Sequence, residues 1–155
     1  MKTIQPRIKN PAMLIPDVMQ PLMAFVAAVR KSAVSQRTLD LVHLRASQIN
    51  GCSVCVDMGS RELKNDGESD ERLFAVAAWR ESPYFTDGER AALALTESLT
   101  RLADRSEAVP DDIWEGAVKH FDETELATLL LAIATINVWN RLNAAVRQPV
   151  GAWKV

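Results

Sequence analysis

The segment from Leu126 to Asn143 is apolar on nearly every side when it is drawn as a helix. A surface helix normally has one apolar stripe and one polar face, so a helix of this kind needs cover on all sides. The Asp122-x-x-Glu125 pair just before it is typical of a reciprocal N-terminal cap, here with Asp in the capping position. We therefore expect a long helix that is either the central helix of the fold or part of a subunit interface.

Caps and helix breakers divide the rest of the chain into further helical segments, and almost nothing alternates like a β-strand. The expected helices run from Asp17 to about Val34, from Ser35 to Asn50, from about Cys52 to Asn65 and from Asp70 to Arg80, and others begin near Thr86 and Pro110. A chain of 155 residues fits one compact domain. The sequence predicts an all-α helical bundle of about seven helices, a single domain over residues 1–155 with an extended leader over residues 1–16.

The charge balance argues against nucleic acid as a partner. The chain has 18 Lys and Arg against 20 Asp and Glu, a net charge of -2, and no basic run. Its longest apolar stretch, Leu126 to Trp139, is interrupted by polar residues and is shorter than the ~20 residues of a membrane-spanning helix. The first residues also lack the apolar region of a secretory signal. We expect a cytoplasmic protein that binds neither nucleic acid nor a membrane.

The two cysteines of the chain, Cys52 and Cys55, form a C-x-x-C motif directly after an Asn-Gly pair that stops a helix. At the start of the next helix, aligned backbone N–H groups favour thiolate over thiol. A zinc site would need two more ligands, and His43 and His120 lie in no zinc-finger spacing, so we expect no metal. The motif therefore predicts reversible thiol–disulfide chemistry, with two buried and inert thiols as the alternative.

A polar strip made of Asp40, His43 and Ser47 lies on the helix before the cysteines. Asp and His at positions i and i+3 can form a hydrogen bond, and the carboxylate then favours the imidazolium. His43 is a candidate general base if it faces the thiols, and a structural or solvated Asp–His pair is the alternative. On the cysteine helix, Gly59 shares a face with Cys52 and Cys55, and we expect its missing side chain to leave a gap beside the sulfurs.

Four stretches of the sequence match a known pattern: residues 39–60, which include the C-x-x-C motif, and residues 77–80, 85–97 and 132–142. On these stretches, most of the chain beyond the leader resembles the AhpD-like alkylhydroperoxidases of the carboxymuconolactone decarboxylase superfamily. The resemblance implies an all-helical subunit that assembles as a homo-oligomer, a trimer or hexamer. It also implies a redox-active C-x-x-C motif with peroxide-reducing or disulfide-exchange activity.

The peroxidase signature of that family is a Glu, eleven residues, a Cys, two residues, a Cys, three residues and a His. By this spacing the resemblance assigns Cys55 as the cysteine that reacts first with peroxide and Cys52 as the resolving cysteine. Asp40 stands in the position of the Glu, and Gly59 in that of the His. The proton relay is thus shortened at one end and deleted at the other, and we expect His43 to replace the missing imidazole in part.

The predicted function is that of a thiol-dependent oxidoreductase that reduces hydroperoxides in antioxidant defence, with Cys55, Cys52, Asp40 and His43 as its catalytic residues. The expected substrate is a hydroperoxide, and an external thiol or dithiol is the expected reductant. We expect no bound cofactor. Two alternatives remain open: a thiol–disulfide oxidoreductase that acts on a partner protein, and a redox-sensing oligomer with little peroxidase activity.

Overall fold

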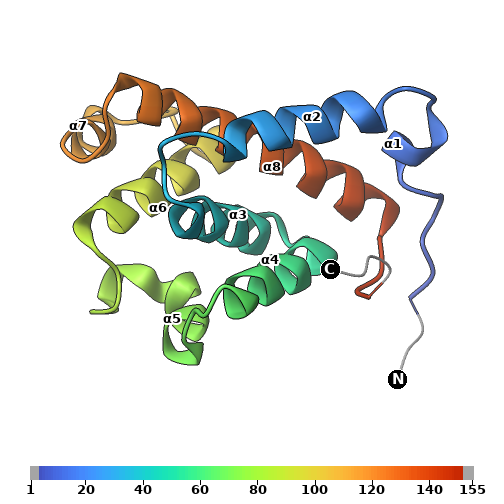
Figure 1. The fold of residues 1–155 in the computed structure, drawn as a ribbon, viewed down its shortest axis with the longest axis horizontal. Helices are drawn as coiled ribbons and strands as arrows, with labels where there is room; N and C mark the ends of the chain where they lie inside the picture. The colour runs from blue at the N-terminus through green and yellow to red at the C-terminus, as the bar shows by residue number, and fades with distance from the viewer. Residues whose placement is uncertain (1–3, 152–155) are drawn as a thin grey trace.

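The computed structural model describes residues 4–151, which form eight α-helices, two 3-10 helices and no β-strand (Figure 1). The α-helices are α1 (Pro11–Leu14), α2 (Met19–Arg30), α3 (Gln36–Asn50), α4 (Ser53–Asn65), α5 (Asp70–Ala75), α6 (Asp87–Thr100), α7 (Asp111–Val118) and α8 (Glu123–Val146). The 3-10 helices are η1 (Val76–Glu81), after α5, and η2 (Leu102–Asp104), after α6. The predicted all-α fold is confirmed.

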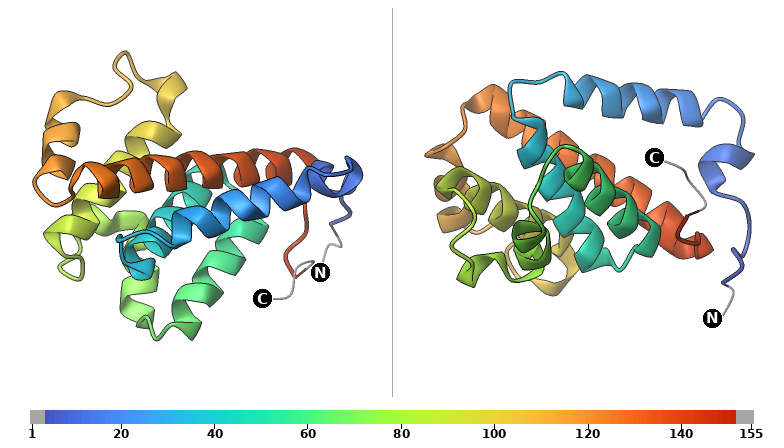
Figure 2. Two further views of the ribbon diagram at one scale, coloured as in Figure 1. Left: turned by 45° about the horizontal axis from the view of Figure 1, so that its top comes forward. Right: turned by 60° about the horizontal axis from the view of Figure 1, so that its bottom comes forward.

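The longest helix is α8, with 24 residues, and α2 packs against it (Figure 1; Figure 2, left). Its length and composition would allow it to cross a membrane, but half of its apolar window is buried within the fold. Leu131 and Val138 remain exposed on the other side. Within the single chain, one face of α8 is therefore open, and a subunit interface stays the prediction for this face.

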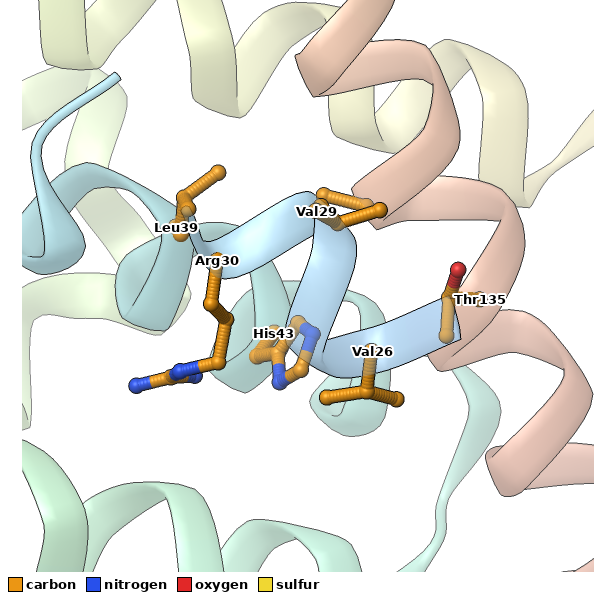
Figure 3. A pocket seen from close by; sticks show the side chains of 7 residues that line it. Val26, Val29, Arg30, Leu39, His43 and Thr135 are labelled. Atoms are coloured by element: carbon orange, nitrogen blue, oxygen red, sulfur yellow. The ribbon is translucent and has the colours of Figure 1, made fainter. Parts of the chain in front are cut away.

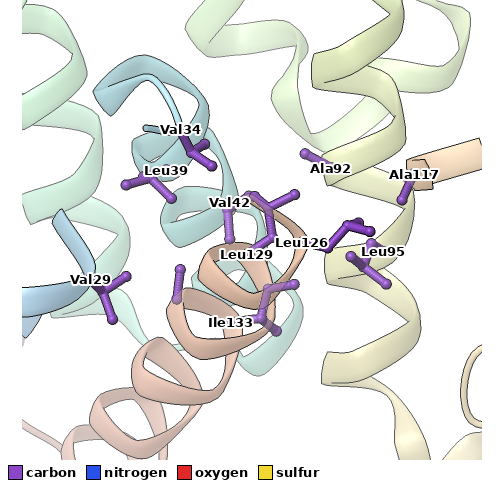
Figure 4. Close-up of a cluster of buried hydrophobic side chains, with 11 residues drawn as sticks. Val29, Val34, Leu39, Val42, Ala92, Leu95, Ala117, Leu126, Leu129 and Ile133 are labelled. Atoms are coloured by element: carbon purple, nitrogen blue, oxygen red, sulfur yellow. The ribbon is translucent and has the colours of Figure 1, made fainter. Parts of the chain in front are cut away.

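Helix α3 stands between two hydrophobic clusters and packs against α8, α4 and α6. The larger cluster joins α3 to α6 and α8 and includes Leu39, Val42, Leu95, Leu129 and Ile133 (Figure 4). The other joins α3 to α4, η1 and α6, and it includes Leu41, Leu44, Trp79 and Leu93. Because α3 contributes side chains to both clusters, it fixes the start of α4, where the cysteines lie.

Capping residues explain most of the helix boundaries. The predicted capping boxes, Thr86 with Glu89 and Asp122 with Glu125, are both present. In each box, the side chain of either residue accepts a hydrogen bond from the backbone N–H of the other. Ser35 caps α3 through the backbone N–H of Thr38. Such caps satisfy N–H groups that have no partner within the helix.

Three segments differ from the sequence prediction. Asp17 does not cap α2, because its backbone is left-handed (φ 66°), and the helix starts at Met19 and ends at Arg30. The single helix expected over residues 70–80 is instead α5 followed by η1, with a kink at Ala78. The leader contains one helical turn, α1, because Asn10 caps it and Pro11 suits its first position.

Candidate functional site

The two cysteines lie at the N-terminal end of α4 and are joined by a disulfide bond. Gly51 adopts the left-handed conformation (φ 65°) that turns the chain out of α3, as glycine does readily. Cys52 is then the N-cap residue of α4, and Cys55 lies in its first turn. Unpaired backbone N–H groups at this end of the helix stabilise a thiolate when the pair is reduced.

A cleft of about 800 Å³ opens beside the disulfide. The leader, the turn between α3 and α4 and the segment from the end of α8 onward form its walls, with the lining residues Ile4, Gln5, Gly51, Cys52, Ser53, Asn143, Ala144, Arg147, Gln148, Pro149 and Val150. The cysteines themselves are nearly covered, with 1% of Cys52 and 8% of Cys55 exposed. A small molecule in this cleft would lie against the disulfide turn, whereas the sulfurs are shielded from bulk water.

Two asparagines from distant parts of the chain form a series of hydrogen bonds that ends at the disulfide. The Nδ2 atom of Asn143, on α8, donates a hydrogen bond to Cys55 Sγ at 3.5 Å. The Nδ2 atom of Asn10, in the leader, donates to Asn143 Oδ1 at 2.7 Å. The sequence analysis missed both residues, and the available signal was an unexplained asparagine within an apolar helix.

Further asparagines hold the turn between α3 and α4 against α8. Asn50 Nδ2 donates to Asn137 Oδ1 and Asn140 Oδ1, each at 2.9 Å, and Asn140 Nδ2 donates to Ser47 Oγ at 3.0 Å. The Ser47 hydroxyl donates in turn to the backbone carbonyl of His43. Buried polar groups that are satisfied in this way restrict the packing to one arrangement, so the disulfide turn has a fixed position on α8.

The carboxyl group of Asp40 is fully buried and forms an ion pair with Arg30 at 2.8 Å. Its second oxygen, Oδ2, has no hydrogen-bond partner within the described chain. Burial raises the pKa of Asp40, although the charge of Arg30 acts against this rise. Burial likewise raises the pKa of Glu62, on α4, and the charge of Asp40 contributes to that rise. These carboxyl groups therefore hold protons more readily than exposed ones, but no described hydrogen bond joins either to the cysteines.

His43 lines a small pocket between α2, α3 and α8, together with Val26, Arg30 and Thr135 (Figure 3). Burial and the neighbouring positive charge of Arg30 lower the pKa of His43 from 6.5 to about 4. No hydrogen bond joins its ring to Asp40 in the described chain, and the carboxylate of Asp40 accepts from Arg30 instead. The expected Asp40–His43 pair with a charged imidazole is therefore wrong. In addition, neither cysteine lines the pocket beside His43.

Gly59 is buried where α4 crosses α3, and it does not border an open gap. A Cβ atom at this position would lie 3.7 to 3.9 Å from backbone and Cβ atoms of Leu44, which is ordinary van der Waals contact. The expected empty space beside the sulfurs is thus occupied by α3. Packing at the Cβ position does not itself require glycine.

Comparison with other proteins identifies the family. The sequence profile of the carboxymuconolactone decarboxylase family matches residues 16–98. The uncharacterized protein YdfG of Bacillus subtilis (strain 168) is 33% identical over 132 residues, which cover 85% of this chain and 88% of YdfG.

Solved structures share the fold. A protein of unknown function from Agrobacterium tumefaciens, suggested to be the antioxidant defence protein AhpD, is 36% identical, with a TM-score of 0.88 over 96% of this chain and 100% of that one. An uncharacterized peroxidase-related protein from Ralstonia eutropha JMP134, with an alkylhydroperoxidase AhpD core, is 15% identical, with a TM-score of 0.79 over 95% and 77% of the two chains. The chain therefore belongs to the carboxymuconolactone decarboxylase family and has the AhpD-like fold.

Proposed function

We propose that this protein is a thiol-dependent oxidoreductase that reduces hydroperoxides by cycling Cys52 and Cys55 between dithiol and disulfide. The observation that carries the proposal is the disulfide at the N-terminal end of α4, beside a cleft that admits a small molecule. The suggested antioxidant role of the Agrobacterium protein supports it. We place the reaction in the cytoplasm, where an external thiol or dithiol would restore the reduced pair.

The proposed cycle has two steps on the protein. The Cys55 thiolate attacks the terminal oxygen of the hydroperoxide, so that the O–O bond breaks, Cys55 becomes a sulfenic acid and the alkoxide takes a proton to leave as an alcohol. The Cys52 thiol then attacks the sulfenic sulfur, releases water and forms the disulfide found in the structure. Two electrons and two protons from the external thiols return both cysteines to the reduced state.

The proton supply to the alkoxide is the weak point of this cycle. Gly59 provides no acid, and an imidazole with a pKa of about 4 at His43 is almost entirely unprotonated at neutral pH. General acid assistance is worth about 10²- to 10⁴-fold in rate. These residues favour a second function, thiol–disulfide exchange with a partner protein, because a thiolate leaves a disulfide without such an acid.

Two measurements on the reduced protein separate these functions. Stopped-flow fluorescence follows oxidation by an organic hydroperoxide and, separately, by a small disulfide. In the Cys52→Ser variant, peroxide should leave Cys55 as a sulfenic acid that dimedone traps, and the Cys55→Ser variant should give no adduct. Fast disulfide exchange without any adduct in Cys52→Ser would replace the peroxidase function with the exchange function.

We also propose that the chain forms a homo-oligomer, through the open face of α8 and its neighbour α2. Leu131 and Val138 are exposed two turns apart on α8, and Met23 and Phe25 are exposed on α2. An apolar surface of this kind is costly for a monomer in water. Sedimentation velocity should show a trimer or hexamer for the natural chain and a shift toward monomer for Leu131→Glu, whereas a natural chain that sediments as a monomer would contradict the proposal.

A further inference from the structure

We propose that the side-chain amide of Asn143 stabilises the Cys55 thiolate, and that Asn10 in the leader holds this amide in the required orientation. The inference rests on the proposed function, because a thiolate forms at Cys55 only when the pair is reduced. Asn143 is then a catalytic residue, since its Nδ2 atom contacts the reacting sulfur. Asn10 is a positioning residue that acts through Asn143.

The orientation of both amides follows from a chain of hydrogen bonds that starts at a backbone donor. The backbone N–H of Ala12 can only donate, so the atom that it reaches at 2.9 Å is the Oδ1 oxygen of Asn10. The Nδ2 group of Asn10 therefore points to Asn143 and binds its Oδ1 oxygen at 2.7 Å. The Nδ2 group of Asn143 is left to face Cys55 Sγ at 3.5 Å. A flipped Asn143 would place its oxygen against the sulfur and its Nδ2 group against the Nδ2 group of Asn10, so both hydrogen bonds would be lost.

Because Asn10 and Asn143 are buried, the contact between Asn143 and Cys55 matters most when the sulfur is charged. Only 1% of Asn10 and 7% of Asn143 is exposed, so little water competes for these groups. A hydrogen bond to an ionised acceptor is stronger than one to a neutral acceptor, and a thiol sulfur accepts weakly. The amide of Asn143 therefore stabilises the thiolate more than the thiol, and it lowers the pKa of Cys55.

The leader is held in place by contacts other than Asn10. The backbone N–H of Arg7 donates to the carbonyl of Val146 at 2.8 Å, and its guanidinium group donates to the carbonyl of Ala145 at 3.1 Å. Both carbonyls belong to the last turn of α8, where the C=O groups have no hydrogen-bond donor within the helix. The leader thus donates hydrogen bonds to the free carbonyls at the end of α8, and these contacts also position Asn10 beside Asn143.

Charged side chains near the disulfide turn also act on the sulfur. Arg147 is the charged side chain among the described residues that line the cleft, and its positive charge acts in the same direction as the amide. Asp57, on α4, is paired with Arg61 at 3.0 Å. Neither residue is changed in the experiment, so both contribute equally to every variant.

The test measures the pKa of the Cys55 thiol directly. Cys52→Ser leaves Cys55 as the single thiol of the chain, and its alkylation rate by iodoacetamide is followed by mass spectrometry across a range of pH. Added to this background, Asn143→Asp replaces the donor with a carboxylate of the same shape. Asn10→Ser keeps an oxygen that can cap α1 but withdraws the amide that orients Asn143. Asn65→Asp, at the exposed end of α4, is the matched control for added charge.

We expect Asn143→Asp to raise the pKa of Cys55 by about one to two units, which slows alkylation by about ten- to a hundredfold at a pH below the Cys55 pKa of the background protein. Asn10→Ser should slow it by about three- to tenfold, and Asn65→Asp should match the background protein. An unchanged pKa in Asn143→Asp would overturn the whole inference, and an unchanged pKa in Asn10→Ser would overturn the role of the leader. If Asn143→Asp does not fold, as judged by circular dichroism, Asn10→Ser alone decides.

The outcome is independent of the proposed function, because alkylation needs neither peroxide nor turnover. A raised pKa in these variants together with no oxidation by peroxide in the natural chain would uphold the role of Asn143 and reject only peroxide reduction. Normal peroxide turnover with unchanged pKa values would do the reverse.

Discussion

The burial of His43 makes the stability of the fold sensitive to acid. In the folded protein the imidazole binds a proton with a pKa of about 4, against 6.5 in the unfolded chain, because burial and the charge of Arg30 oppose protonation. Between these two values the unfolded chain binds more protons than the folded one. The free energy of unfolding must therefore fall as the pH drops through 6.5 toward 4, and this loss stops below the lower value.

The size of the effect follows from the two pKa values. Each pKa unit corresponds to about 1.4 kcal/mol, so the shift of His43 predicts a loss of roughly 2 kcal/mol between about pH 7 and about pH 5. The residue keeps partial access to solvent, which reduces this to about 1–2 kcal/mol. A change of this size is a substantial fraction of the stability of a small domain.

Urea unfolding followed by tryptophan fluorescence measures this loss. Between about pH 7 and about pH 5, we expect the free energy of unfolding of His43→Gln to fall by about 1–2 kcal/mol less than that of the natural chain. Carboxyl groups such as Asp40 titrate in both proteins. The difference between their losses of stability therefore reports on His43 alone. The exposed His120 gives a matched control, and His120→Gln should lose stability just as the natural chain does. Equal acid sensitivity in His43→Gln and the natural chain would refute the assignment of His43 to a desolvating pocket.

Two further substitutions test the packing around the site. Gly59→Ala should raise the free energy of unfolding by about 0.5–1 kcal/mol, because alanine favours the helix and its Cβ would only touch Leu44; a loss of stability in urea would show that glycine is needed for close contact. Glu97→Gln should cost about 3 kcal/mol, since Arg45 and Trp79 both donate to this buried carboxylate, and an unchanged urea midpoint would contradict the importance of the ion pair. Although burial acts to raise the pKa of Glu97, these hydrogen bonds hold it below its usual value, so the cost should shrink when the carboxylate is protonated by acid.

Local signals in the sequence were sufficient for the turn before the cysteines and for the starts of α6 and α8. The left-handed turn at Gly51 and the capping boxes at Thr86 and Asp122 depend on neighbouring residues only, so they could be predicted from the chain itself. The position of Cys52 at the start of α4 followed from the same turn.

The surroundings of the site depend on contacts between distant segments, and these could not be predicted. The pKa of His43 is lowered because α2 and α8 bury its side chain and because α2 brings Arg30 beside it, and no pattern in the sequence indicates how α2 lies. Asn10 and Asn143 are 133 positions apart and meet only because the leader returns along α8. Their role required the folded structure.

The central claim is that Cys52 and Cys55 form a reversible redox pair, and a redox titration tests it most directly. The native protein is equilibrated in mixtures of reduced and oxidised dithiothreitol, and the free thiols are alkylated and counted by mass spectrometry. The account predicts one transition between two free thiols and none, with the same midpoint from either direction. A pair that stays oxidised in every native buffer, or thiols that never react with the reagent unless the protein is unfolded, would contradict it.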